Sequence, residues 1–231
     1  MCDLMRRQPR RPVWATLTLA VVLHLAAITT GIASADDATT PNPQVLIQTS
    51  QGDIRLVLLP EQAPQTVANF LAYVDANAYD GTIFHRVIPD FMIQGGGFDT
   101  EYARRPTREP ITNEADNGLQ NTRGTIAMAR TSAPHSATNQ FFINVSDNAF
   151  LDHQRKTRRG WGYAVFGRVV DGMDVAEAIS TVETGSAGPF ARDAPLETIV
   201  IERIRRVAPS PANEPPDTAT PAPADEGDGT E

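Results

Sequence analysis

The sequence predicts a mainly β domain in which antiparallel strands form a barrel and α-helices lie over its ends. Three observations favour this class: β-rich runs are short, turn residues separate them, and helical periodicity occurs at only two places. About eight strands and two helices in roughly 165 residues fit such a barrel. Periodicity alone leaves a β-sandwich as the alternative.

The predicted strands follow one another along most of the folded part. Residues with high β-propensity mark strands at 45–49, 54–59, 82–87, 124–129, 140–144, 163–170 and 198–204. Ser50–Asp53 joins the first two as a hairpin, and Gly52 supplies the turn. Alternation also continues around Met92 and Gln94, which adds a further strand.

Two helices interrupt this series of strands. The first begins at Pro64, because proline suits the first helical position. Its core face recurs at i, i+3, i+4 and i+7, with Val67, Phe70, Leu71 and Val74. Asp171 is the expected N-cap of the second helix, which turns Val175 and Ile179 toward the core.

Residues 1–35 have the composition of a secretory signal peptide. Four arginines come first, an apolar run from Val13 to Ile32 follows, and Ala33-Ser34-Ala35 forms a site of small residues. We therefore expect cleavage after Ala35 and a periplasmic protein with no stable membrane insertion. An uncleaved membrane anchor is the alternative, since the apolar run is about long enough to span a bilayer.

The remainder of the chain divides into a linker, a domain and a tail. Residues 36–43 are a short linker, and residues 44–207 contain all of the predicted helices and strands. Residues 208–231 are rich in proline, alanine, threonine and acidic residues and contain no aromatic residue. Such a segment buries too little apolar surface to offset its ordering entropy, which predicts a disordered tail.

Charge and side-chain inventory exclude several classes of function. The net charge of -8 argues against nucleic-acid binding, and the short basic run at 155–159 is interpreted as a solvated loop. The only cysteine, Cys2, lies in the signal, so the mature protein suits an oxidising compartment. No ligand spacing links His85, His135 and His153, and we expect neither a metal ion nor a cofactor.

Polar and apolar side chains alternate in a way that suggests a binding surface. Alternation predicts three pairs that share a strand face: Phe84 with Arg86, Met92 with Gln94, and Gln140 with Phe142. A concave surface with these side chains suits a neutral, partly apolar ligand. It contains neither a nucleophile with an adjacent base nor a pair of carboxylates.

Several motifs in this region resemble the cyclophilins, a family of peptidyl-prolyl cis-trans isomerases. They are F-H-R-V-I-P-D-F-M-I-Q-G-G at 84–96, G-T-I-A-M-A-R at 124–130 and N-Q-F-F-I-N at 139–144. The stretches at 113–125 and 147–153 resemble the periplasmic bacterial branch. The resemblance covers about residues 44 to 205 and implies an eight-stranded antiparallel closed barrel capped by two α-helices.

The resemblance also implies roles for individual residues. Arg86 matches the catalytic arginine and Gln94 the glutamine that orients it, and Phe91 belongs with them as a catalytic residue. The substrate-binding positions are Phe91, Met92, Phe142 and Leu151 as walls of a proline pocket, Ala129 and Arg130 on the lining backbone, and Gln140 as a further contact.

Two further substrate-binding positions depart from the pattern of many family members. Phe150 stands where those members have a tryptophan that contacts cyclosporin, and Tyr163 stands where they have a histidine. Both departures resemble the bacterial branch. We therefore expect weak cyclosporin binding and an unimpaired catalytic arginine.

The function implied by the resemblance is isomerisation of Xaa-Pro bonds while exported proteins fold, by a non-covalent mechanism centred on Arg86. The partners would be proline-containing, unfolded or partly folded polypeptides, and the protein would be a monomer. The alternative is a chaperone or scaffold module that binds proline segments with little turnover. An isomerase assay separates the two.

Overall fold

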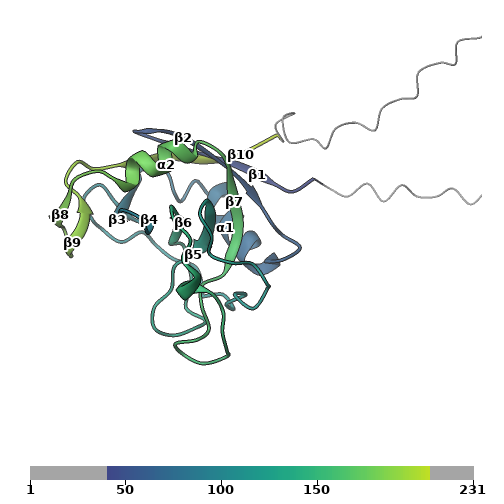
Figure 1. Cartoon of the computed structure of the whole chain (residues 1–231). Coiled ribbons are helices and arrows are strands. Elements are labelled where there is room, and N and C mark those ends of the chain that lie inside the picture. The colour runs from purple at the N-terminus through teal and green to yellow at the C-terminus, as the bar shows by residue number, and fades with distance from the viewer. Residues whose placement is uncertain (1–40, 209–231) are drawn as a thin grey trace, which may run out of the picture. The chain divides into compact units, whose positions relative to one another are not determined.

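Eight strands close into an antiparallel barrel in the structure, a computed structural model that describes residues 41–208 (Figure 1). The order around the barrel is β1-β10-β3-β4-β6-β5-β7-β2. Neighbouring strands are antiparallel and the sheet closes on itself, and this closure confirms the predicted barrel and excludes the β-sandwich. The predicted signal peptide, residues 36–40 of the linker and residues 209–231 of the tail lie outside the described residues.

The elements are β1 Gln44–Thr49, β2 Gly52–Leu58, α1 Pro64–Asp75, β3 Thr82–Ile88, β4 Met92–Asp99, β5 Thr125–Met128, β6 Phe141–Asn144, η1 Ala149–Leu151, β7 Val165–Asp171, α2 Met173–Ser180, β8 Thr184–Ala187, β9 Phe190–Pro195 and β10 Val200–Val207. The predicted hairpin is β1–β2, in which Thr49 pairs with Gly52. Most other predicted strands occur with ends shifted by a few residues. In the described chain, neither helix is long and apolar enough to cross a membrane.

An apolar cluster fills the barrel interior and extends beneath α1. All four residues of the predicted core face of α1 are buried: Val67, Phe70, Leu71 and Val74. Phe70 packs against Phe141 edge-on, with ring centroids 5.6 Å apart, and against Phe166 at 5.1 Å. The helix thereby joins strands β6 and β7 through one continuous core.

The start of α1 is capped from a distant part of the chain. Ala63 at the N-cap position makes no side-chain bond to the helix. Instead the carboxylate of Glu114 accepts from the backbone N–H groups of Gln65 and Thr66, at 3.1 and 2.8 Å. This long-range contact satisfies backbone donors that the helix itself leaves unpaired.

The predicted N-cap of the second helix is wrong. Asp171 is the last residue of β7, and Gly172 takes the cap position with φ of 77°. A Cβ atom at residue 172 would lie 2.1 Å from the carbonyl oxygen of Asp53, so only glycine fits here. Ile179 is fully buried as expected, and Val175 packs at the edge of the core.

The predicted pairing of Phe84 and Arg86 on one face of β3 is also wrong. Phe84 is buried in the interior cluster, whereas Arg86 lies on the outer side of the barrel. Phe84 pairs with Gly95 and Arg86 pairs with Gln94, so β3 has one more residue than β4 at this point. His85 is that extra residue, and the bulge reverses the side on which the following side chains lie.

The hairpin of β8 and β9 has no counterpart among the predicted strands. Its sequence, from Thr184 to Pro195, contains glycine, proline and polar residues rather than a β-rich run. The two strands form a separate two-stranded sheet. Figure 1 shows this hairpin beside β3 and β4, at the edge of the barrel.

Candidate active site

One row of paired residues crosses the outer face of the barrel. Arg86 on β3 pairs with Gln94 on β4, Gln94 pairs with Phe142 on β6, and Phe142 pairs with Ala127 on β5. The bulge at His85 brings Arg86 into this row. Residues from four strands thus converge on one patch.

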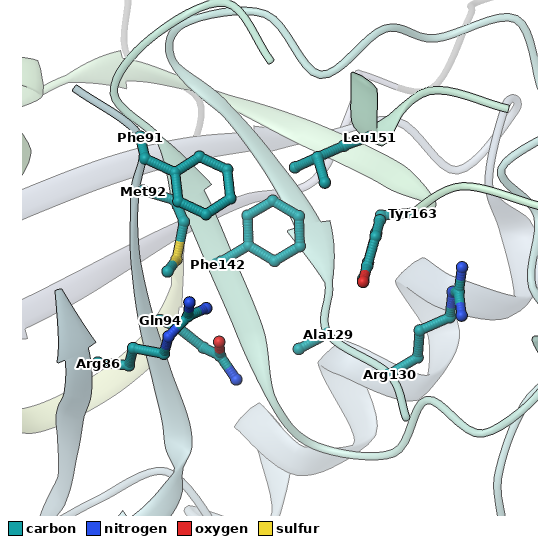
Figure 2. Close-up of a pocket in the computed structure, with 9 residues that line it drawn as sticks. All are labelled: Arg86, Phe91, Met92, Gln94, Ala129, Arg130, Phe142, Leu151 and Tyr163. Atoms are coloured by element: carbon teal, nitrogen blue, oxygen red, sulfur yellow. The ribbon is translucent and has the colours of Figure 1, made fainter. Parts of the chain in front are cut away.

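This patch is the floor of an open pocket of about 150 Å³ (Figure 2). Nine of the eleven predicted site residues line it: Arg86, Phe91, Met92, Gln94, Ala129, Arg130, Phe142, Leu151 and Tyr163. They come from β3, β4, β6, η1 and the loops that follow β3, β5 and η1. The structure therefore brings most of the predicted site together.

The walls of the pocket are apolar. Met92, Phe142 and Leu151 form a small cluster with Ala127 and Val165, separate from the barrel interior. The rings of Phe142 and Tyr163 meet edge to face, with centroids 5.7 Å apart. Figure 2 shows Phe91, Phe142 and Leu151 around one end of the pocket and Arg86 and Gln94 at the other. The site therefore combines an apolar slot with polar groups on one side.

Arg86 provides the positive charge on that side. Its guanidinium points toward Gln94 and Met92 (Figure 2), and its side chain is 38 % exposed. Gln94 Nε2 donates to Gln140 Oε1 at 2.9 Å, which leaves the Gln94 amide oxygen on the Arg86 side. No hydrogen bond joins Arg86 to Gln94 within residues 41–208; the nearest carboxylate to Arg86 is that of Asp193, at 3.6 Å.

The far side of the pocket is held by Arg130. Its Nε donates to the carbonyl of Gly162 at 2.8 Å, and its guanidinium carbon lies 4.6 Å from the centroid of the Tyr163 ring. The backbone N–H of Ala129 donates to the carbonyl of Gln140 at 2.9 Å. These contacts hold the backbone of Ala129 and Arg130, which lines the pocket, next to the start of β6.

Two predicted site residues do not line this pocket. Gln140 lies in an adjoining polar cleft of about 290 Å³ and reaches the site only through Gln94. Phe150 is 69 % exposed, and its ring centroid is 5.5 Å from that of Phe91. It therefore extends the apolar rim outward instead of forming a wall.

A chain of buried asparagines supports the pocket from behind, and the sequence-based prediction did not include it. Asn148 Nδ2 donates to the carbonyl of Phe91 and to Asn144 Oδ1, at 2.9 and 2.8 Å. Asn144 Nδ2 in turn donates to Asn121 Oδ1 at 3.3 Å. These bonds tie the loop that carries Phe91 to the segment that carries Leu151. The only signal in the sequence is asparagine next to apolar residues, which is equally typical of turns.

The chemistry available in the pocket is binding and polarisation. The nine lining residues include no serine, cysteine, histidine or carboxylate, so a covalent intermediate has no nucleophile with a neighbouring base. Among the described residues, no three histidine, cysteine or acidic side chains cluster as metal ligands would. A permanently charged arginine next to an apolar slot instead stabilises developing negative charge or a lone pair on a neutral ligand.

The comparison with a known protein family gives one match over most of the chain. The family model described as cyclophilin type peptidyl-prolyl cis-trans isomerase matches residues 44–206. Those residues include every strand of the barrel except the last residue of β10.

Several curated proteins are similar over the same region. Peptidyl-prolyl cis-trans isomerase cyp18 of Streptomyces antibioticus is 61% identical over 161 residues, which is 70% of this chain and 96% of the relative. Peptidyl-prolyl cis-trans isomerase A of Dickeya dadantii is 55% identical, over 73% of this chain and 86% of the relative. Isomerase B of Escherichia coli is also 55% identical, over 69% and 97%.

Solved structures of the same type have a similar fold. A crystal structure of a cyclophilin type peptidyl-prolyl cis-trans isomerase from Cryptosporidium parvum superposes with a TM-score of 0.55 and 26% identity, over 73% of this chain and 99% of that chain. A second crystal structure of that protein, in the presence of the dipeptide Ala-Pro, gives a TM-score of 0.54 and 27% identity, over 72% and 99%.

Proposed function

The chain belongs to the cyclophilin-type peptidyl-prolyl cis-trans isomerases and is such an isomerase, and we propose that Arg86 is its central catalytic residue. The observation that carries the proposal is the position of Arg86 on the rim of an apolar pocket, opposite Phe142 and Leu151. The pocket holds the proline ring, and the arginine acts on the bond next to it.

The reaction needs no covalent step. Resonance gives the peptide C–N bond partial double-bond character and a rotational barrier of about 18–20 kcal/mol. In the twisted transition state this resonance is lost, and the prolyl nitrogen becomes pyramidal and more basic. An enzyme that binds the twisted amide more tightly than either planar form accelerates the exchange.

Arg86 is suited to this differential binding. Its guanidinium is charged at all relevant pH values and donates a hydrogen bond to the lone pair of the prolyl nitrogen, which is delocalised in the planar amide and becomes an acceptor when the amide is twisted. A hydrogen bond to a charged group contributes roughly 1.5–3 kcal/mol. Each ~1.36 kcal/mol of such selective stabilisation raises the rate about tenfold. The apolar walls strengthen this bond because they exclude water.

Gln94 is proposed to keep the guanidinium in place. Its amide group is held from the other side by Gln140, which accepts from Gln94 Nε2. The amide oxygen of Gln94 is therefore available to accept from Arg86. This arrangement explains how Gln140, outside the pocket, contributes to the site.

The decisive experiment compares Arg86→Ala with the native protein in an NMR exchange or protease-coupled assay on a short Xaa-Pro peptide. We expect kcat/KM to fall at least about tenfold while the fold and the melting temperature are retained. Arg203→Ala is the matched control, because Arg203 is an exposed arginine paired with Asp80 and does not line the pocket. Unchanged activity in Arg86→Ala would refute the proposed mechanism. Peptide binding without acceleration in the native protein would favour the chaperone or scaffold module instead.

The proposed substrates are proline-containing segments of unfolded or partly folded polypeptides. Support comes from the apolar slot and from the similar parasite enzyme whose structure was determined in the presence of Ala-Pro. We further propose that the protein is a monomer. We also propose that it binds cyclosporin weakly, because Phe150 and Tyr163 stand where the family resemblance implies a tryptophan and a histidine.

We also propose that the protein is exported to the periplasm and acts on exported proteins. The proposal rests on the arginine-rich start, the apolar run and the small-residue site that ends at Ala35. Mass spectrometry of the protein from the native cell measures its N-terminus. A mature chain that begins at Asp36 supports export with cleavage, and an intact N-terminus in the membrane fraction favours the anchor.

A further inference from the structure

The carboxylate of Asp193 lies beside the proposed catalytic arginine. Asp193 Oδ2 is 3.6 Å from Nε of Arg86, and Asp193 is the only residue in the described part of the chain whose carboxylate lies within 4.0 Å of that guanidinium. The contact involves Nε, which leaves the terminal Nη groups of Arg86 free to donate. Figure 2 shows those groups pointing toward Gln94 and the pocket.

The backbone at Asp193 is in an uncommon conformation. Its φ is 64°, a left-handed value that disfavours most side chains and that aspartate and asparagine tolerate best. Gly185 pairs with Ala194 and Ala187 pairs with Phe190, so β9 contains extra residues between these pairs, and Asp193 is one of them. Irregular strands of this kind redirect a side chain, here toward Arg86 and the exposed Arg192, whose Nε atoms lie 3.6 and 3.7 Å from Asp193 Oδ2.

The β8–β9 hairpin that carries Asp193 is docked on the barrel through aromatic rings. Phe190 stacks on His85, with ring centroids 5.1 Å apart and planes at 25°, and meets Phe98 edge-on at 5.1 Å. The turn of the hairpin presses on Tyr102: Gly188 has φ of 51°, and a Cβ atom there would lie 2.3 Å from the ring. Because His85 precedes Arg86 in the chain, the hairpin is attached at the bulge that aims the arginine.

From these observations we propose that Asp193 is a positioning residue for catalysis, which holds the Nε edge of Arg86 so that its Nη donors face the substrate. The proposal rests on the proposed function of Arg86. The carboxylate does not touch the substrate in this arrangement. It acts by limiting the orientations of a long side chain, and its loss lets the guanidinium sample non-productive orientations.

Asp193→Asn is the sharpest test, because asparagine has the same size, tolerates the left-handed backbone and removes only the charge. We expect kcat to fall about threefold to fivefold, the range of a partly exposed ion pair, with KM within about twofold of native. The melting temperature should be retained. Asp75→Asn is the matched control, since it removes a carboxylate from the exposed pair with Arg206 and is expected to leave kcat unchanged.

The same exchange in the Arg86→Ala background distinguishes this inference from the proposed function. If Asp193 acts through Arg86, Asp193→Asn has no further effect on the residual activity of Arg86→Ala. An unchanged or raised kcat in the single variant Asp193→Asn, or an equal loss in both backgrounds, would overturn the positioning role. If Arg86→Ala itself retains full activity, the proposed catalytic role of Arg86 fails as well.

Discussion

The barrel interior and the outer pocket are two apolar clusters built on the same strands, but they have different surroundings. Phe141 and Phe142 are neighbours on β6, yet Phe141 lies in the interior cluster and Phe142 in the pocket wall. Phe141 is fully buried and meets Phe70, Tyr79 and Phe84 edge-on. Phe142 meets one ring, that of Tyr163, and has an open pocket on its other side.

The difference shows how one strand serves stability and catalysis at the same time. Interior side chains are surrounded on all sides, so the energy of each contact contributes to folding. Pocket side chains such as Phe142 are also largely buried, but they border open space on one side, where the substrate adds further contacts. A residue in the pocket wall therefore contributes less to folding and more to binding than its neighbour on the interior side.

Phe141→Ala should have the largest effect on stability. Truncation removes a fully buried ring and leaves a cavity beside three aromatic neighbours, so we expect a loss of about 3–5 kcal/mol in the free energy of unfolding. Urea denaturation measures it. Any molecules that remain folded should keep kcat/KM close to native. A loss below that of Phe142→Ala would break the contrast between the two clusters.

Phe142→Ala should mainly affect activity. Its ring forms the wall between Met92 and Tyr163, and without it the pocket no longer fits a proline ring closely. We expect kcat/KM to fall at least about tenfold, and the unfolding free energy to fall by about 3 kcal/mol, the lower end of the range for truncating a buried ring. The two variants should be measured side by side, with the same peptide and the same denaturant. Native activity in Phe142→Ala would show that the pocket is not the site.

The buried His85, next to Arg86, should make the stability of the protein depend on pH. Burial lowers the pKa of His85 to about 4, and the charges of Arg86 and Arg104 act in the same direction. Between pH 6.5 and 4 the unfolded chain therefore binds a proton that the folded protein does not, so stability falls as the pH decreases. We expect the free energy of unfolding to be about 1 kcal/mol lower at pH 5.5 than at pH 7.5.

A His85→Gln variant is the control for that prediction. It lacks the titrating imidazole, so the difference in stability between the two pH values should become much smaller. An equal pH dependence in the native and variant proteins would mean that another group is responsible.

Much of the fold and of the site was predictable from local patterns. The β1–β2 hairpin, the start of α1 at Pro64 and the core face from Val67 to Val74 follow from turn chemistry and periodicity, and the structure confirms them. The opposite faces of Phe141 and Phe142 follow from the two-residue period of a strand. The β8–β9 hairpin was missed because its glycines, proline and polar residues resemble a loop.

Local patterns show which side chains the chain offers to a binding surface, and the family resemblance identifies Arg86 and eight further residues that meet in one pocket. The side of the barrel on which Arg86 lies, and the carboxylate beside it, follow from contacts between segments far apart in the chain. The physical reason is that alternation is a local property of a strand, whereas a bulge depends on pairing with its neighbour. Arg86 contacts Asp193 because the β8–β9 hairpin docks on His85. No local pattern in the sequence predicts that docking.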